Sequence, residues 1–170
     1  QVDREYYVND AGRQMDILAT STYLRYLELT GQTLVFPKNA YQGDYVKDIA
    51  KSIIAKDGAT HARPVLDVYH TVPEDVQYAE ELDSDGNKVV LSDDKEKHID
   101  GLIANAQQLL GANYRVFHQA ALKAILDDIQ DDLSDFGVTF DAWFSEASLT
   151  DKIEEALATL DARGFLYEQD

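Results

Sequence analysis

The sequence contains no cysteine, only three prolines and one tryptophan, and no long hydrophobic run. The lack of cysteine excludes a disulfide framework and a thiolate zinc site, and it favours an intracellular protein. The longest apolar runs are short, such as Val89–Leu91, so we expect no membrane-spanning helix. The first five residues are mostly charged or polar and do not form the apolar part of a signal peptide. The first residue is not Met, which favours a natural start further upstream.

Basic residues are scarce beside acidic ones. The chain has 15 Lys and Arg against 32 Asp and Glu, a formal net charge of −17. Such a surface repels phosphate, so we expect the chain by itself to bind nucleic acid poorly. With 45% hydrophobic residues over 170 positions, it can still build one medium core or a part of a larger one.

Hydrophobic residues recur at helical spacing in several stretches. After Arg13 they fall on one broad face, which predicts a helix. Gly31 is expected to end this helix by taking the left-handed backbone conformation. The chain from Asp93 to Lys97 is charged and expected to be solvated. The same spacing predicts helices at Asp44–Lys56, His98–Leu110, Tyr114–Leu133 and Asp151–Ala162, and Val72–Asp75 has the proline and acids of a helix start.

Two stretches near the ends of the sequence are typical of β-strands. Arg4–Asn9 is rich in tyrosine and valine, and Val138–Phe144 alternates between apolar and polar residues. Lys88–Ser92 and a stretch beginning at Phe165 are shorter candidates. We expect the first two strands to pair in parallel with the helices as their crossover, which makes the fold α/β and predominantly helical.

No part of the sequence predicts a metal site. His61, His70, His98 and His118 lack the spacing of ligands on one helix face and are expected at the surface or partly buried with partners. The segment Asp83–Asn87 begins like a calcium loop, but the glycine and glutamate that such a loop needs are absent from the required positions. We therefore expect a solvated surface loop there.

Four blocks of sequence resemble, in the same order, parts of the arginyl-tRNA synthetases. They are the strand and turn at Arg4–Gln14, the helix at Met15–Leu29, the stretch Tyr41–Ala50, and Asp131–Leu149 with Phe140-Asp141-x-Trp143-Phe144-Ser145-Glu146 inside it. Four blocks in one order are more specific than any single block. They cover both ends of the chain, whereas residues 59–113 match weakly.

The resemblance implies an internal fragment of a class I synthetase, whose Rossmann-type nucleotide-binding fold is interrupted by insertions. Residues 1–40 would be the second strand–turn–helix of that fold, 41–112 a helical insertion, and 113–170 the return helix, strand and helix. An arginyl-tRNA synthetase is a cytoplasmic enzyme that activates arginine with ATP and Mg²⁺ and transfers it to the 3′ end of tRNA(Arg).

The sequence also departs from that family. It contains neither the His-x-Gly-His nor the Lys-Met-Ser-Lys motif, which in class I enzymes neutralise charge developing on the ATP phosphates. The segment that grips the substrate guanidinium is missing too. We therefore expect no catalytic residue in this chain, no ATP or Mg²⁺ bound to it alone, and no aminoacylation by it alone.

The resemblance points to candidate binding residues at the first turn. It places Asn9, Asp10, Gly12 and Gln14 on the rim of the arginine–adenylate pocket, at the end of a strand where open α/β sheets bind ligands. Asp10 would attract the ammonium or guanidinium group of the substrate. The alternative is a plain turn and helix cap, in which Gly12 serves the backbone shape.

Aromatic residues supply the remaining candidates. Tyr41 and Tyr45 are possible contacts of the tRNA acceptor end, although packing is the commoner role of tyrosine. Trp143 and Phe144 fall on opposite faces of their strand, so one should enter the core and the other should pack on the remainder of a longer synthetase chain. A second interpretation of the whole sequence is a free-standing acidic helical module that binds protein partners.

Overall fold

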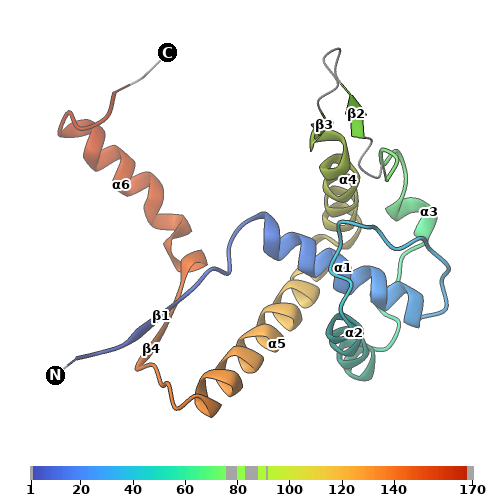
Figure 1. The fold of residues 1–170 in the computed structure, drawn as a ribbon, viewed down its shortest axis with the longest axis horizontal. Coiled ribbons are helices and arrows are strands. Elements are labelled where there is room, and N and C mark those ends of the chain that lie inside the picture. Colours follow the sequence, from blue (N-terminus) through green and yellow to red (C-terminus); the bar gives the residue numbers. More distant parts are fainter. Residues whose placement is uncertain (1, 76–79, 83–87, 91, 168–170) are drawn as a thin grey trace. The chain divides into compact units, whose positions relative to one another are not determined.

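The computed structural model describes residues 2–75, 80–82, 88–90 and 92–167, so the predicted loop at residues 83–87 lies outside the described part. The described residues are mostly helical, with two small sheets (Figure 1). The elements are β1 (Glu5–Val8), α1 (Arg13–Leu29), α2 (Asp44–Asp57), α3 (Val65–Val68), β2 (Glu80–Leu82), β3 (Lys88–Val90), α4 (Ser92–Leu110), the 3-10 helix η1 (Gly111–Asn113), α5 (Tyr114–Asp135), β4 (Ala142–Ser145), the 3-10 helix η2 (Glu146–Leu149) and α6 (Thr150–Ala162).

The chain divides into two compact units. The strand unit comprises Gln1–Gly12 and Gln130–Asp170, and the helical unit comprises Arg13–Ile129. In the strand unit, β1 pairs in parallel with β4, with Glu5 opposite Ala142 and Val8 opposite Ser145. The predicted parallel pairing with a helical crossover is therefore confirmed, and Figure 1 shows the two strands side by side.

Aromatic residues fill both faces of this two-stranded sheet. Tyr6 stacks on Trp143 with ring centroids 4.4 Å apart, and Tyr7 stacks on Phe144 at 6.1 Å. The predicted opposite placement of Trp143 and Phe144 agrees with this pairing. The prediction that one of them is core is wrong, because both side chains are only half-buried. In the described part of the strand unit, only Val8 and Asp10 are buried.

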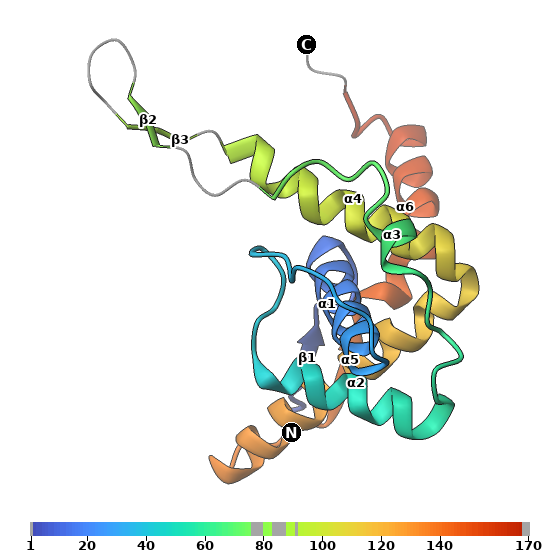
Figure 2. The same cartoon turned by 90° about the vertical axis from the view of Figure 1, so that its right-hand side faces the viewer.

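Helix α1 is the centre of the helical unit, where it packs against α2 and α4 (Figure 2). Its predicted apolar face is confirmed, since Ile17, Leu18, Tyr23, Leu24 and Leu27 are all buried. Burial extends around the helix to Thr20, Ser21 and Thr22, whose hydroxyl groups all have hydrogen-bond partners. Gly31 follows the last turn with a φ of 95°, as predicted for a glycine that ends a helix in the left-handed backbone conformation.

The predicted helix start at Val72 is wrong. Residues 72–75 are not helical, because tertiary contacts along α4 outweigh the local helix signal. A β-carbon at Gly101 would lie 3.3 Å from Val72 Cγ1, so the absence of a side chain at Gly101 lets residues 72–75 pack closely against α4. His98 Nδ1 lies 2.6 Å from the Pro73 carbonyl oxygen and is the donor in that contact.

Two other boundaries differ from the prediction. Helix α4 already begins at Ser92, so the charged run up to Lys97 is part of this helix. No strand begins at Phe165: residues 165–167 are irregular and pair with no strand among the described residues. No helix in the described part of the chain is both long and apolar enough to cross a membrane.

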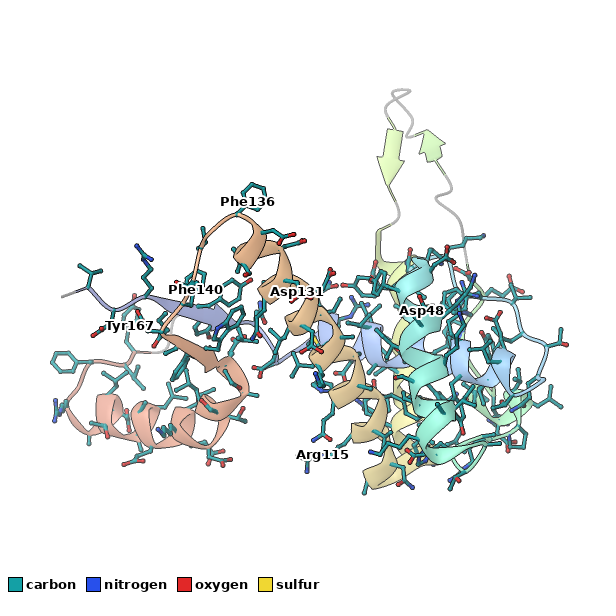
Figure 3. The ribbon with its side chains drawn as sticks, turned by 90° about the horizontal axis from the view of Figure 1, so that it is seen from below. Asp48, Arg115, Asp131, Phe136, Phe140 and Tyr167 are labelled. Atoms are coloured by element: carbon teal, nitrogen blue, oxygen red, sulfur yellow. The ribbon has the colours of Figure 1, made fainter. Side chains whose placement is uncertain are left out.

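Replacing Phe117 by Ala should lower the free energy of unfolding by about 3–5 kcal/mol, since it leaves a cavity among fully buried aromatic rings. Urea unfolding followed by circular dichroism measures this loss. Phe136→Ala is the matched control, because Phe136 is 85% exposed and projects from the ribbon in Figure 3. Equal losses in both variants would contradict the described core.

Candidate functional site

The carboxyl ends of β1 and β4 lie at the same edge of the small sheet. Parallel pairing places Val8 beside Ser145, so the residues that follow each strand emerge together. After β1 come Asn9 and Asp10, and after β4 comes Glu146. Open α/β sheets bind ligands at this kind of edge, because the loops after neighbouring strands diverge there.

The Asp10 carboxylate links the two loops. Its Oδ2 accepts a hydrogen bond from Ser145 Oγ at 2.6 Å, and its Oδ1 accepts one from the Ala147 backbone N–H at 2.8 Å. Asp10 is 7% exposed, so the carboxylate is removed from water and depends on these donors. The Ala147 N–H belongs to the first turn of η2, where helical N–H groups lack a partner within the helix. Asp10 thus caps η2 from a distant part of the chain.

Asn9 and Glu146 lie beside this link and are more accessible. With the Asn9 amide oriented to suit its neighbours, its nitrogen donates to Glu146 Oε2 at 2.8 Å and to the Ala11 carbonyl oxygen at 3.2 Å. Asn9 is exposed and Glu146 is half-buried. The pKa of the Tyr7 hydroxyl is raised, first by loss of solvation and then by the nearby Glu146 carboxylate. The edge therefore carries negative charge beside neutral donors.

Gly12 ends the turn after β1. Its φ of 91° lies in the region that side-chain-bearing residues avoid. A β-carbon would meet no atom within 4 Å there, so the backbone angle and not space demands glycine. This geometry agrees with the alternative interpretation of the sequence, in which Gly12 is needed for the backbone shape of the turn.

Gln14, Tyr41 and Tyr45 belong to the helical unit. Tyr41 donates from its hydroxyl to Gln14 Oε1 at 3.1 Å, so two candidates that the sequence assigned to different roles are in contact. The Tyr41 backbone N–H also donates to Ser21 Oγ at 3.0 Å. Tyr45 is 42% exposed, and burial followed by the neighbouring Tyr41 raises the pKa of its hydroxyl.

Neither the histidines nor the acids form a metal centre within the described ranges, where no group of three or more possible ligands occurs. His61 and His98 are buried and each has a hydrogen-bond partner on one ring nitrogen, but the buried Nδ1 of His61 has none, so the expectation of partnered histidines holds only in part for His61. His61 Nε2 lies 3.2 Å from Asp57 Oδ2.

Ser145, Glu146 and Ala147 were not among the residues predicted to form the site. The sequence did contain a usable signal, because these residues directly follow the strand that was expected to pair with the first one. Residues after adjacent parallel strands meet at one edge. Asp10, in contrast, was predicted to lie at the site, but its hydrogen bonds with Ser145 and Ala147 could be identified only from the structure.

One solved structure has a similar fold. A crystal structure of a Campylobacter jejuni protein assigned as an arginyl-tRNA synthetase aligns with 99% of the chain, with a TM-score of 0.57 and 22% identity, and 27% of that protein is covered. No protein-family model matches the chain. The fold is therefore similar to a segment of an aminoacyl-tRNA synthetase.

Sequence relatives are more specific. The chain is 83% identical over all 170 residues to the arginine–tRNA ligase of Acinetobacter baylyi, of which it covers 28%. It is 58% identical over 169 residues to the arginine–tRNA ligase of Psychrobacter cryohalolentis, of which it covers 27%. The chain thus spans about a quarter of the length of these relatives. Its resemblance to the arginyl-tRNA synthetases is confirmed: it corresponds over its whole length to a segment of the arginine–tRNA ligases.

Replacing Asn9 by Asp should weaken the strand unit by about 1 kcal/mol, because the donor to Glu146 becomes an acceptor carrying the same charge. Trp143 is the one tryptophan of the sequence and lies in β4, so urea unfolding followed by its fluorescence reports on this unit. Asn113→Asp adds the same charge at an exposed position of the helical unit. If both variants unfold at the same urea concentration, the contact between Asn9 and Glu146 is unimportant.

Proposed function

We propose that this chain is an internal part of the catalytic region of a cytoplasmic arginine–tRNA ligase. The complete enzyme would activate arginine with ATP and Mg²⁺ and then transfer it to the 3′ end of tRNA(Arg). The observation that supports this most strongly is the 83% identity over the whole chain to an arginine–tRNA ligase. The alternative of a free-standing acidic interaction module is not favoured, because such relatives match every part of the sequence.

The small parallel sheet is proposed to belong to a Rossmann-type fold interrupted by an insertion. In this proposal residues 1–40 supply the second strand–turn–helix, 41–112 the helical insertion, and 113–170 the returning helix, strand and helix. The support is the parallel pairing of β1 with β4 across the intervening helices. A two-stranded sheet is seldom stable alone, so further strands from the complete enzyme would extend it.

The turn after β1 is proposed as the rim of the arginine–adenylate pocket, with Asn9, Asp10 and Gly12 as its members, and the sequence resemblance adds Gln14 at the start of α1. The support is the polar, negatively charged edge formed by Asn9, Asp10 and Glu146, since an anionic edge suits a cationic amino acid. ATP with Mg²⁺ would bind to this enzyme through its two signature motifs, which this sequence does not contain. No residue of this chain is therefore assigned to the phosphates or the metal.

The remainder of the synthetase is proposed to pack on the strand that carries Trp143 and Phe144. Both side chains are only half-buried in this chain. Large hydrophobic residues of the same unit are also exposed, among them Phe136 at 85%, Ile153 at 54% and Leu157 at 48%. Large hydrophobic side chains that are exposed in this way are typical of surface that another part of a protein covers.

The complete enzyme should catalyse arginine-dependent exchange of pyrophosphate into ATP when tRNA(Arg) is present, and it should charge that tRNA. The chain of 170 residues by itself should do neither, because it lacks both ATP-handling motifs. The exchange assay and acid-stable labelling of tRNA with radioactive arginine measure both activities. Activity of the isolated chain, or preference of the complete enzyme for another amino acid, would contradict the proposal.

Tyr41 and Tyr45 are proposed to contact the acceptor end of the tRNA, with Tyr45 as the more accessible of the two. Replacing Tyr45 by Ala in the complete enzyme should raise KM for tRNA about tenfold, the scale of one lost stacking contact with a base. KM for arginine should change little. Val35→Ala removes a side chain that is 79% exposed on the same helical unit and is the control. An unchanged KM for tRNA in Tyr45→Ala would leave packing as the role of this residue.

A further inference from the structure

Asp10 is the only charged residue that is buried in the described part of the strand unit. A buried carboxylate is costly unless hydrogen-bond donors compensate for the lost water. Here each oxygen has a protein donor: Ser145 Oγ at 2.6 Å for Oδ2, and the Ala147 N–H at 2.8 Å for Oδ1. Both donors come from one short segment, the junction of β4 and η2.

The two donors flank Glu146. Ser145 is the last residue of β4 and Ala147 lies in the first turn of η2, so the Asp10 carboxylate binds the Ser145 side chain and the Ala147 backbone on either side of Glu146. Glu146 is half-buried, and its Oε2 accepts a hydrogen bond from the Asn9 amide at 2.8 Å. Asn9 and Glu146 therefore have solvent access at this edge, whereas the Asp10 carboxylate is buried.

We propose that Asp10 is a positioning residue of the arginine pocket, which acts by fixing the Ser145–Ala147 segment and makes no contact with the substrate itself. The proposal rests on the function proposed above and assigns Asp10 a role different from direct attraction of the cationic amino acid. Hydrogen bonds to an ionised carboxylate are stronger than those between neutral groups, which suits a contact that sets the geometry of a loop. Asp10 shapes the edge, and Glu146 is the carboxylate that the fixed junction presents at it.

The two roles differ in what they require of residue 10. A direct contact with a cationic substrate requires the negative charge. A positioning role requires hydrogen bonds, and Asp10→Asn can keep both: its amide oxygen accepts from the Ala147 N–H, and the Ser145 hydroxyl can rotate to accept from the new amide nitrogen. Asp10→Ala removes both bonds, and Ser145→Ala removes one of them.

A second carboxylate in the same sheet provides a matched control. Asp141 Oδ2 accepts a hydrogen bond from the Arg4 backbone N–H at 2.8 Å, so it links β1 and the start of β4 at their amino ends. The Asp141 N–H in turn donates to the Arg4 carbonyl oxygen at 2.8 Å. Asp141→Ala removes a carboxylate link between the same two strands, but at the edge away from the proposed pocket.

The test uses the complete synthetase with Asp10→Ala, Asp10→Asn, Ser145→Ala, the double variant Asp10→Ala/Ser145→Ala, and Asp141→Ala. Steady-state aminoacylation gives kcat and KM for arginine, each corrected for the fraction of active enzyme, and thermal melts give stability. Asp10→Ala should lower kcat/KM for arginine about tenfold or more, the factor expected for one or two lost hydrogen bonds to a charged group. Asp10→Asn should recover most of this loss.

Ser145→Ala should show part of the same loss, and the double variant should be no worse than Asp10→Ala alone, because both changes break one contact. Asp141→Ala should lower the melting temperature and leave KM for arginine unchanged. If Asp10→Asn is as defective as Asp10→Ala while Ser145→Ala is normal, the charge contacts the substrate and the proposal is wrong. It is also wrong if Asp10→Ala lowers only the melting temperature.

The outcome for the unmodified enzyme separates this inference from the proposed function. If the unmodified complete enzyme fails to attach arginine to tRNA, the proposed function itself has failed. If it is active and the Asp10 variants behave as a direct contact or as a purely structural residue, only the positioning role has failed.

Discussion

Two hydrogen bonds accepted by one buried carboxylate join parts of the chain that lie 135 and 137 residues apart. They connect the turn after the first strand to the junction that follows the last one. The parallel pairing of β1 with β4 brings these segments to the same edge, and Asp10 then determines how they face each other. Without this pairing, Asn9 and Glu146 would not meet, and the chain would have no candidate binding edge.

The strand unit has the properties of an incomplete layer. Its aromatic pairs, Tyr6 with Trp143 and Tyr7 with Phe144, cover both faces of two strands, yet few residues of the described part are buried. The helical unit differs, because α1 is surrounded by its neighbours and carries fully buried Tyr23 and Tyr26. This contrast agrees with a chain that covers about a quarter of its relatives, since a small sheet needs more strands or helices to become a core.

Much of this fold could be predicted where a local pattern and the tertiary structure agree. The face of α1 follows from the spacing of Ile17, Leu24 and Leu27, and the end of that helix follows from Gly31. The helix expected from Val72 failed because contacts with α4 decide the path of that segment. Such contacts involve residues far away in sequence and leave no periodic signal.

At the candidate site, too, local features could be predicted from the sequence and long-range contacts could not. The polar turn with Asn9, Asp10 and Gly12 could be recognised from sequence, but two roles for Asp10 remained open. The structure supplies the distant partners, Ser145 and the Ala147 N–H, and they favour a structural link over an exposed charge. Glu146 was missed although it directly follows the strand expected to pair with the first one, because its contact with Asn9 is visible only in the structure.

The most direct measurement is a crystal structure of the complete protein with bound arginine or a non-hydrolysable arginyl-adenylate analogue. The account predicts that β1 and β4 are neighbours in a larger parallel sheet, and that the amino acid lies at their carboxyl edge beside the Asn9–Gly12 turn. An arginine bound elsewhere, with the carboxyl ends of β1 and β4 buried against other parts of the enzyme, would contradict it.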